Sequence, residues 1–314
     1  MGSGLRTFAG LALLTLGFLG TLATALGFFG STSWFFDLLS NFRFQLALGL
    51  IVVGVVYFFG FGRWTAFIFV AAGVVNAFLV APLYLDDPAP AAAGDSLRLV
   101  SFNVGAGRAD TAELVEWMET SEADLVFLLE SSEEWLGGME MNGSGYSVSN
   151  QIPEDRIYGI SVLGTSPTVV EQLRLGSTRD PVMRVEATVS GETVAIYAVH
   201  PRPPDSAAKT AARDDLFDEL ADMVARETLP VIVIGDFNAT PWSYIFRDFS
   251  SETGLVNSQK GFGLAATWPT SPLSLVPLDH MLHSESLTTV ERDIGPDLGS
   301  DHLPLTVEVS VASN

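Results

Sequence analysis

The sequence contains no cysteine, and this absence removes several kinds of chemistry. Without thiols the chain has no disulfide framework, no thiolate zinc site and no thiol nucleophile. Basic residues are also scarce, since 16 Lys and Arg stand against 37 Asp and Glu and give a formal net charge of −21 at pH 7. Such a chain repels polyanions over long range and lacks the basic surface typical of a non-specific nucleic-acid binder.

Charged side chains are nearly absent from the first 85 residues, which contain only Arg6, Asp37, Arg43 and Arg63. The other 13 basic and 36 acidic residues lie from Asp86 onward and give that part a net charge of −23. This change in composition predicts two domains. For the second domain, solubility or a salty medium is the simplest explanation of so many acidic residues.

The first 85 residues contain three apolar runs. Each is about twenty residues long, the length that crosses about 30 Å of hydrocarbon. We therefore expect residues 1–85 to form a transmembrane anchor with helices over about 8–29, 44–61 and 64–84. Asn76 is the one strongly polar side chain in the third run, and a hydrogen bond between helices is its simplest role. A substrate or ion path is the alternative.

The arginines near the ends of these runs predict an orientation. Arg6 and Arg63 would lie on the cytoplasmic side, so that the chain emerges outside after Tyr84. We expect a multi-pass membrane protein whose soluble domain is extracytoplasmic. The segment ending in Ala23-Thr24-Ala25 could instead be a cleaved signal peptide, but the apolar run continues to Phe29 and favours an uncleaved helix. Cleavage would leave a hairpin and the same orientation.

Residues 86–96 are rich in proline and alanine and predict an extended linker. From 97 to 314 short β-rich runs alternate irregularly with amphipathic stretches, which predicts an α/β domain with mixed sheets. We expect helices over 111–121 and 206–226, and a hairpin at Ser190-Gly191. The expected strands cover 97–103, 125–129, 160–163, 182–189, 193–199, 231–234, 280–283 and 303–309.

Residues capable of metal binding or proton transfer follow directly after four of these strands. They are Asn103, Glu130, His200, and Asp236 with Asn238. Side chains at the ends of several buried strands can converge, and together these would supply the oxygen ligands that Mg²⁺ or Mn²⁺ prefers, plus a base. Two further acidic and histidine pairs, Asp279-His280 and Asp301-His302, occur near the C-terminus.

Each of these residues also has an ordinary explanation. Asn103 could form a turn before Gly105, Glu130 could cap the next helix, and His200 could start a proline-rich loop. Their joint occurrence in one order is what favours a site.

Six motifs in this order resemble those of the endonuclease/exonuclease/phosphatase superfamily. They are Ser101-Phe102-Asn103-Val104, Leu128-Leu129-Glu130, Val199-His200-Pro201, Gly235-Asp236-Phe237-Asn238-Ala239-Thr240-Pro241, Leu278-Asp279-His280 and Gly299-Ser300-Asp301-His302-Leu303-Pro304. The superfamily includes DNase I, apurinic endonucleases, inositol-polyphosphate phosphatases and neutral sphingomyelinases. The resemblance implies a four-layer α/β/β/α sandwich over residues 97–314, with the site between the edges of two sheets.

The resemblance also implies a role for each motif residue. Glu130 would be the principal Mg²⁺ (or Mn²⁺) ligand, with Asn103 and Asp301 close to the metal or to water on it.

The remaining motif residues would carry the chemistry. Asp236 would position or deprotonate the attacking water, and Asn238 would hold a phosphate oxygen. His302 would act as a general base or as a cation against the phosphate, with Asp279 orienting its imidazole. His200 would stabilise developing charge or assist the leaving group.

Three residues are candidates for substrate contacts: Arg156, Tyr158 and Trp268. For Trp268, packing in the domain core is the slightly favoured alternative. The number of metal ions stays open.

The leading hypothesis is a membrane-anchored phosphoesterase acting on a phosphodiester or phosphomonoester, such as a lipid head group or a small phosphorylated metabolite. A nuclease acting on extracellular DNA is the first alternative, and the acidic charge disfavours it. A non-catalytic protein that binds a ligand or partner is the second, and it need not retain a complete set of metal and base residues. No protein partner can be inferred.

Overall fold

The computed structural model describes residues 3–87, 90–92, 94–141, 143–152, 157–166, 169–271 and 275–313. The chain divides into two compact units. The first consists of Met1–Leu85 with Thr240–Arg247, and the second of Asp86–Ala239 with Asp248–Asn314.

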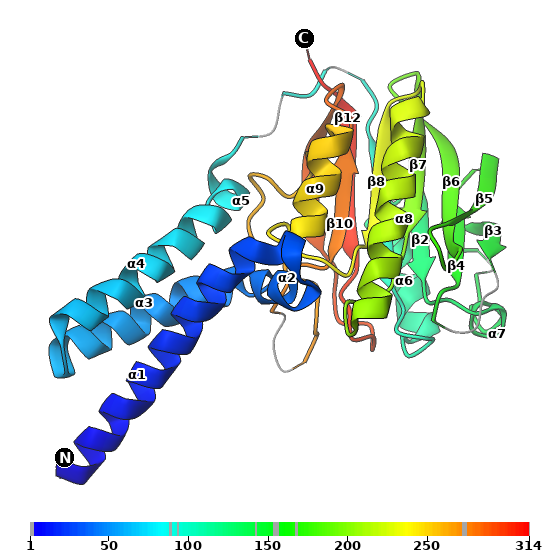
Figure 1. Ribbon diagram of the computed structural model, residues 1–314. Helices are drawn as coiled ribbons and strands as arrows, with labels where there is room; N and C mark the ends of the chain where they lie inside the picture. Colours follow the sequence, from blue (N-terminus) through cyan, green and yellow to red (C-terminus); the bar gives the residue numbers. More distant parts are fainter. Residues whose placement is uncertain are drawn as a thin grey trace. The chain divides into compact units, whose positions relative to one another are not determined.

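The first unit is helical. Its elements are α1 (Ser3–Leu26), the 3₁₀ helix η1 (Gly27–Thr32), α2 (Trp34–Ser40), α3 (Arg43–Gly60), α4 (Arg63–Val80) and α5 (Pro82–Leu85) (Figure 1). Three helices, covering Gly4–Thr32, Arg43–Gly60 and Arg63–Val80, are long and apolar enough to cross a membrane. They correspond to the three expected runs, although the third ends at Val80, where α5 begins a separate turn.

A buried polar network joins these three helices. The amide nitrogen of Asn76 donates to Thr24 Oγ1 at 2.8 Å, and the Arg43 guanidinium donates to Asn76 Oδ1 at 3.0 Å. Arg43 and Asn76 are both buried. Polar groups without water must pair with one another, so the hydrogen bond between helices expected for Asn76 is confirmed.

The second unit contains two mixed sheets. The first has the order β11-β12-β1-β2-β4-β3 and the second β5-β6-β7-β8-β10-β9. The strands of the first sheet are β1 (Leu97–Asn103), β2 (Leu125–Leu129), β3 (Ser147–Ile152), β4 (Ile160–Gly164), β11 (Leu287–Ile294) and β12 (Leu305–Val311). Those of the second are β5 (Val169–Leu175), β6 (Asp180–Val189), β7 (Glu192–Val199), β8 (Val231–Asp236), β9 (Val256–Asn257) and β10 (Asp279–His283).

Each sheet has one central parallel pair. In the first sheet, β1 and β2 are joined by α6 (Thr111–Ser121); in the second, β7 and β8 are joined by α8 (Ala207–Arg226). A helical crossover is the ordinary connection between parallel strands, and it brings the carboxyl ends of both strands to the same edge. The other pairs in these sheets are antiparallel.

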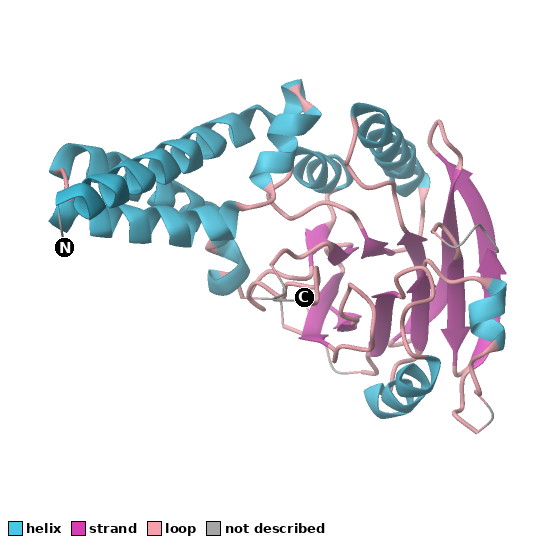
Figure 2. Cartoon of the chain, turned by 90° about the horizontal axis from the view of Figure 1, so that it is seen from below, coloured by secondary structure: helices cyan, strands magenta, loops and turns pink. Residues whose placement is uncertain are grey.

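Alternate residues of the central strands form the core between the two sheets. Leu97 and Leu99 of β1 belong to the same buried cluster as Ile196 and Ala198 of β7. The outer face of the first sheet packs against α6, whereas α8 and α9 (Tyr244–Thr253) lie over the second sheet (Figure 1). Figure 2 shows helices on both sides of the strand layers. The predicted four-layer α/β/β/α sandwich is confirmed.

Most predicted elements are present, and the misses have physical reasons. The hairpin lies at Ser190-Gly191, where both residues have positive φ and Val189 pairs with Glu192. The last strand starts at Leu305 rather than at residue 303, because the Leu303 N–H donates to Thr267 O instead of joining the sheet. Strands β3, β5, β9 and β11 were not expected, since these edge strands carry polar residues on both faces. Helices α7 (Glu133–Gly137) and α9 were not expected either.

Candidate active site

The carboxyl ends of the two parallel strand pairs bring the predicted residues together. Asn103 ends β1 and Glu130 follows β2, while His200 follows β7 and Asp236 ends β8. Asp279, the first residue of β10, pairs in antiparallel register with Asp236. The sheet topology therefore places residues far apart in sequence at neighbouring strand ends.

The amide of Asn103 links the two sheets. Its Nδ2 donates to Glu130 Oε1 at 3.1 Å and to Asp236 Oδ2 at 3.1 Å. His200 Nε2 lies 3.6 Å from the same two carboxylate oxygens. Asn103, His200 and Asp236 are buried, and the Glu130 side chain is 17% exposed. Four of the predicted residues thus form one cluster that is open to solvent at Glu130.

A histidine–carboxylate pair completes the cluster. His302 Nδ1 lies 2.9 Å from Asp279 Oδ2, and His302 Nε2 lies 3.6 Å from Asp236 Oδ2. The hydrogen bond to Asp279 places a proton on Nδ1 and fixes the orientation of the ring. His280, the next residue along β10, instead lies within hydrogen-bonding distance of Ala239 O and is fully buried, so it does not join the cluster.

The backbone at the site is held in uncommon conformations. Glu130 has φ +56° and Asn238 has φ +50°, values that residues other than glycine seldom adopt. Asn238 is held there by two hydrogen bonds, from its N–H to Asp236 Oδ1 at 2.8 Å and from its Nδ2 to Pro201 O at 3.0 Å. Because Nδ2 carries two protons and donates to Pro201 O, one amide proton of Asn238 has no acceptor in the part of the chain that the structure describes.

Burial and neighbouring charges set the protonation of these groups. Burial raises the pKa of Glu130 and of Asp236 and lowers the pKa of His200. Burial alone would lower the pKa of His302, but the carboxylates of Asp279 and Asp236 raise it to about 9. At neutral pH the cluster therefore contains one neutral and one cationic imidazole.

Asp301 lies at the rim of the cluster. Its Oδ1 pairs with the Arg108 guanidinium, and its Oδ2 accepts a hydrogen bond from Trp268 Nε1 at 3.4 Å. Burial would raise the pKa of Asp301, but the charges of His302 and Arg108 lower it. Trp268 is 36% exposed, so the expectation that it packs in the core is wrong. The tryptophan reaches the rim because its indole N–H is held by Asp301.

Tyr158 lies beside His200. Its ring centroid lies 6.0 Å from that of His200, and the Arg202 guanidinium carbon lies 4.7 Å from the Tyr158 centroid. Arg202 is held in turn by Asp180, which accepts from its Nη2 at 2.8 Å and from its Nε at 3.0 Å. Arg156, the other predicted substrate contact, lies outside the described residues.

Several residues next to the site were missed by the sequence reasoning. Arg292 is buried and donates to Ser258 Oγ at 2.6 Å and to Asp279 O at 3.2 Å. Arg108 and Arg202 were missed as well. Arg202 stands two residues after His200 and Arg108 five after Asn103, and this closeness in sequence to motif residues is a signal that could have identified both. Arg292 lies within β11, outside all six motifs, and has no such signal.

The cluster has the donors and spacing of a cation site. Ligand atoms of Asp236, Asp279 and His302 lie within 4.8 Å of one another, so this group could hold a metal ion. His302 Nδ1, however, is engaged by Asp279, and the neighbouring Glu130 carboxylate is the part of the cluster open to solvent, which makes Glu130 the better candidate ligand. Asp279 Oδ1 and His200 Nδ1 are buried and make no hydrogen bond among the described residues, so both atoms remain available to a bound ligand or water.

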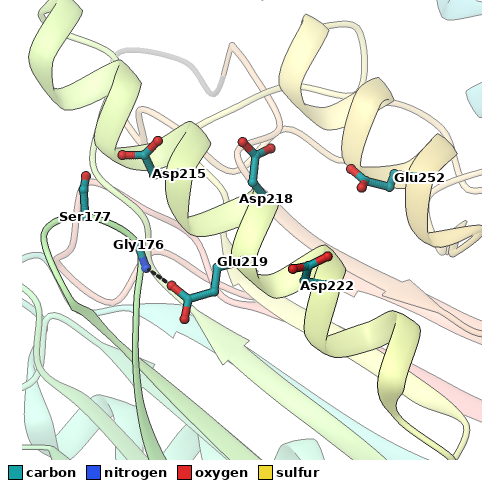
Figure 3. A pocket seen from close by; sticks show the side chains of 7 residues that line it. All are labelled: Gly176, Ser177, Asp215, Asp218, Glu219, Asp222 and Glu252. Carbon is teal, nitrogen blue, oxygen red and sulfur yellow. Dashed lines mark hydrogen bonds between the residues drawn. The ribbon is translucent and has the colours of Figure 1, made fainter.

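A pocket elsewhere in the second unit is lined mainly by acidic residues. It has a volume of about 460 Å³ and is lined by Gly176, Ser177, Asp215, Asp218, Glu219, Asp222 and Glu252 (Figure 3). Glu219 accepts a hydrogen bond from the Gly176 N–H at 2.8 Å, and the other carboxylates have no cation among the lining residues. Such a pocket repels phosphate, and it shares no residue with the strand-end cluster.

Residues 100–302 match the sequence model of the Endonuclease/Exonuclease/phosphatase family. The chain belongs to this family. Members of the superfamily are hydrolases of phosphoester bonds and typically use divalent metal ions. Comparison with curated protein sequences finds no match.

Solved structures of the endonuclease/exonuclease/phosphatase fold resemble the chain. The human Nocturnin catalytic domain with bound sulfate has a TM-score of 0.55 and 18% identity, over 74% of this chain and 99% of its own. TDP2 of D. rerio, complexed with a single-strand DNA product, has a TM-score of 0.56 and 14% identity, over 69% of this chain and 99% of its own. A mannosyl-6-phosphatase of Bacteroides thetaiotaomicron has a TM-score of 0.52 and 15% identity, over 68% of this chain and 99% of its own. At these identities the likeness concerns the fold alone.

Proposed function

We propose that the protein is a membrane-anchored phosphoesterase that depends on Mg²⁺ or Mn²⁺. The observation that carries this proposal is the Asn103 amide bridging Glu130 and Asp236 beside the His302–Asp279 pair. A set of oxygen donors next to a cationic imidazole suits a reaction whose main demand is the neutralisation of charge on phosphate oxygens.

The residues present fit a divalent cation with oxygen ligands. Glu130 would be the principal ligand, with Asn103 beside it and Asp301 reaching water on the metal. When bound, the ion would supply positive charge to the phosphate oxygens and the leaving oxygen.

The chain's own groups would carry the protons. Asp236 would orient the attacking water and accept its proton, a role that its raised pKa supports because a carboxylate of higher pKa is a stronger base. The high pKa of His302 favours a cation against the phosphate over a general base, and Asp279 keeps its Nε2–H directed inward. Neutral His200 would stabilise the leaving oxygen, and the remaining amide proton of Asn238 would hold a phosphate oxygen.

The proposed location is an integral membrane one. Three apolar helices support an anchor in the bilayer, and Arg6 and Arg63 support an extracytoplasmic catalytic domain. Anchoring and an acidic surface favour a lipid head group or a small phosphorylated metabolite as substrate.

DNA is the alternative substrate, favoured by the DNA product bound to the similar D. rerio TDP2. The net charge of the soluble part disfavours it. A non-catalytic binding role is disfavoured by the complete set of acid, base and amide residues in one cluster.

The full-length chain in detergent would be assayed with Mg²⁺ or Mn²⁺ on p-nitrophenyl phosphate, bis-p-nitrophenyl phosphate, phospholipids and plasmid DNA. We expect metal-dependent turnover that His302→Ala reduces by at least about 10²-fold, the usual contribution of one positioned proton carrier or cation. Folded protein that hydrolyses none of these with metal present would contradict the proposal and favour the binding role.

A further inference from the structure

The side chain of Arg108 lies across the loop that follows β1. Its Nε donates to Gly105 O at 2.8 Å, and its Nη2 pairs with Asp301 Oδ1. Asp301 directly precedes His302, and the loop itself begins at Asn103. A guanidinium is thus held at the rim of the cluster.

The loop is shaped around this guanidinium. Gly105 has φ +64°, and a Cβ atom there would lie 2.9 Å from Arg108 Nε and 2.9 Å from Ser300 Oγ. Ser300 Oγ in turn donates to Asn103 O at 2.7 Å. Any side chain at position 105 would displace Arg108 or this hydrogen bond. The missing side chain is therefore what allows Arg108 to lie beside the site.

Arg108 still has hydrogen-bonding capacity for a ligand. Its side chain is 58% exposed, and Nη1 makes no hydrogen bond among the described residues. An exposed ion pair contributes only about 0–1 kcal/mol, so turning the guanidinium from Asp301 toward a substrate costs little.

Arg202, which also lies next to the site, differs in this respect. Arg202 is 25% exposed, and both its Nε and its Nη2 are engaged by the buried Asp180. Breaking that pair would leave a buried carboxylate without its cation, which is strongly unfavourable. Arg202 is therefore a fixed support for Tyr158, whereas Arg108 is free to bind.

Charge explains why such a residue is needed. The soluble part has a net charge of −23, and Glu130, Asp236, Asp279 and Asp301 are all acidic. A substrate with two negative charges would be repelled more strongly than one with a single charge. A planar guanidinium at the rim offsets that repulsion and matches the geometry of phosphate oxygens.

We propose that Arg108 is a specificity-determining residue that binds a phosphate dianion of the substrate. The inference rests on the proposed function and names its substrate class, a compound with a doubly charged phosphate. That dianion is either the scissile phosphomonoester itself or a terminal phosphate on a scissile diester, and both sources share the same chemistry.

The test compares Arg108→Gln with the wild type in the full-length chain. Four substrates are used: p-nitrophenyl phosphate, bis-p-nitrophenyl phosphate, thymidine 5′-(p-nitrophenyl phosphate) and its 3′-phosphorylated form. We expect kcat/KM to fall by about 10- to 100-fold wherever a dianion is present, the effect of one lost hydrogen bond to a charged group, and by less than about 3-fold on the two singly charged diesters. The substrate whose kcat/KM falls identifies the source of the dianion.

Two controls separate binding from structure. Arg226→Gln removes an arginine of α8 that is 68% exposed and also paired with an acidic residue, and it should leave every rate unchanged. Arg108→Lys keeps the charge and should restore part of the lost kcat/KM. If Arg108 acted only by holding Asp301, all four substrates would lose the same factor, and the proposal would be wrong.

A binding measurement keeps the two proposals apart. Inorganic phosphate should raise the melting temperature of the wild type, and Arg108→Gln should weaken its apparent affinity by a similar 10- to 100-fold, or about 1.4–2.7 kcal/mol. If the wild type is inactive but phosphate affinity still falls in Arg108→Gln, the hydrolase proposal is wrong and the assignment of Arg108 as a phosphate-binding residue stands. Unchanged phosphate binding in Arg108→Gln would overturn that assignment whatever the activity.

Discussion

Asn103 shows how one side chain joins the two halves of the site. Its amide donates to a carboxylate of each half, Glu130 after β2 and Asp236 at the end of β8. A residue that only accepted hydrogen bonds at this point would place a further oxygen against both carboxylates and remove the donor that they share. The residue type is therefore dictated by what surrounds it and not by its own strand.

The partner of His302 leads to a prediction about pH. The Asp279 carboxylate is a main reason why the pKa of His302 is about 9. Asp279→Asn should move the alkaline limb of the kcat profile to lower pH and reduce kcat by about 10²- to 10⁴-fold, because the imidazole loses its orientation and much of its charge. Rate measurements from pH 5 to about 10 would check this. An alkaline limb that stays in place would exclude His302 as the cation.

The same pair has a consequence for stability without metal. The folded pKa of His302 lies above the ordinary value of 6.5, so its contribution is fully present below pH 6.5 and is lost as the pH rises toward about 9. In the presence of a chelator, the melting temperature of the wild type should therefore fall over this range more than that of His302→Gln. Parallel curves for the two proteins would contradict the pairing.

At the scale of elements, the strand that carries Asp236 depends on a close approach. Gly235 has φ +147°, and a Cβ atom there would lie 1.9 Å from Val199 O of the neighbouring strand. Gly235→Ala would force β7 and β8 apart beneath both His200 and Asp236.

We expect Gly235→Ala to lower stability by more than about 3 kcal/mol, since both backbone strain and a steric clash must be relieved. Gly191→Ala is the matched control, because Gly191 also has positive φ (+85°) but has no atom within 4 Å of its Cβ position. It should cost only about 1 kcal/mol. Melting temperatures of both variants give the comparison, and equal losses would contradict the close packing of these strands.

An ion pair joins the middle of β6 to Glu227, the residue that follows α8. The Arg184 guanidinium contacts Glu227 at 2.9 Å, and Tyr197 donates to the same carboxylate at 3.0 Å. Burial would raise the pKa of Glu227, but the hydrogen bonds from Arg184 and from backbone N–H groups lower it below 4.5.

A lowered carboxyl pKa stabilises the fold above the unfolded value and is lost as the pH falls through the folded one. Glu227→Gln should therefore melt at a lower temperature than the wild type at pH 7, with the difference shrinking below pH 4.5. A difference independent of pH would show that the pair contributes through packing alone.

At the scale of the whole molecule, the charge of the soluble part affects the rate of substrate capture. Long-range repulsion of anions weakens as the Debye length falls from about 30 Å at 0.01 M salt to about 8 Å at 0.15 M. We expect kcat/KM on a dianionic substrate to rise over this range when metal is saturating. A fall with salt would mean that Arg108 and other local cations dominate the approach.

The absence of cysteine offers a direct test of orientation. Ser313→Cys places the only thiol at an exposed position near the C-terminal end of the sequence, and Gly4→Cys places it near the N-terminal end. In intact cells a membrane-impermeant maleimide should label the first and not the second, because Arg6 and Arg63 predict a cytoplasmic N-terminus. The reverse pattern would contradict an extracytoplasmic domain.

Local patterns in the sequence were sufficient for much of this protein. Apolar runs indicated three helices able to cross a membrane, alternating β-rich and amphipathic stretches indicated an α/β domain with mixed sheets, and polar residues at strand ends indicated the cluster. The four-layer sandwich was implied by the resemblance of six motifs to a known superfamily. These features follow from the hydrophobic effect and backbone periodicity, which act over a few residues and are therefore visible in the chain itself.

Only the tertiary structure decided which of the candidate residues meet. Asp279 faces Asp236 because β10 pairs with β8, and Asp301 reaches Arg108 across 193 positions of sequence. Trp268 lies at the rim for the same reason, held by Asp301 rather than buried. Such contacts depend on strand pairing and loop packing between distant segments, and no local pattern records the partner that a side chain will find.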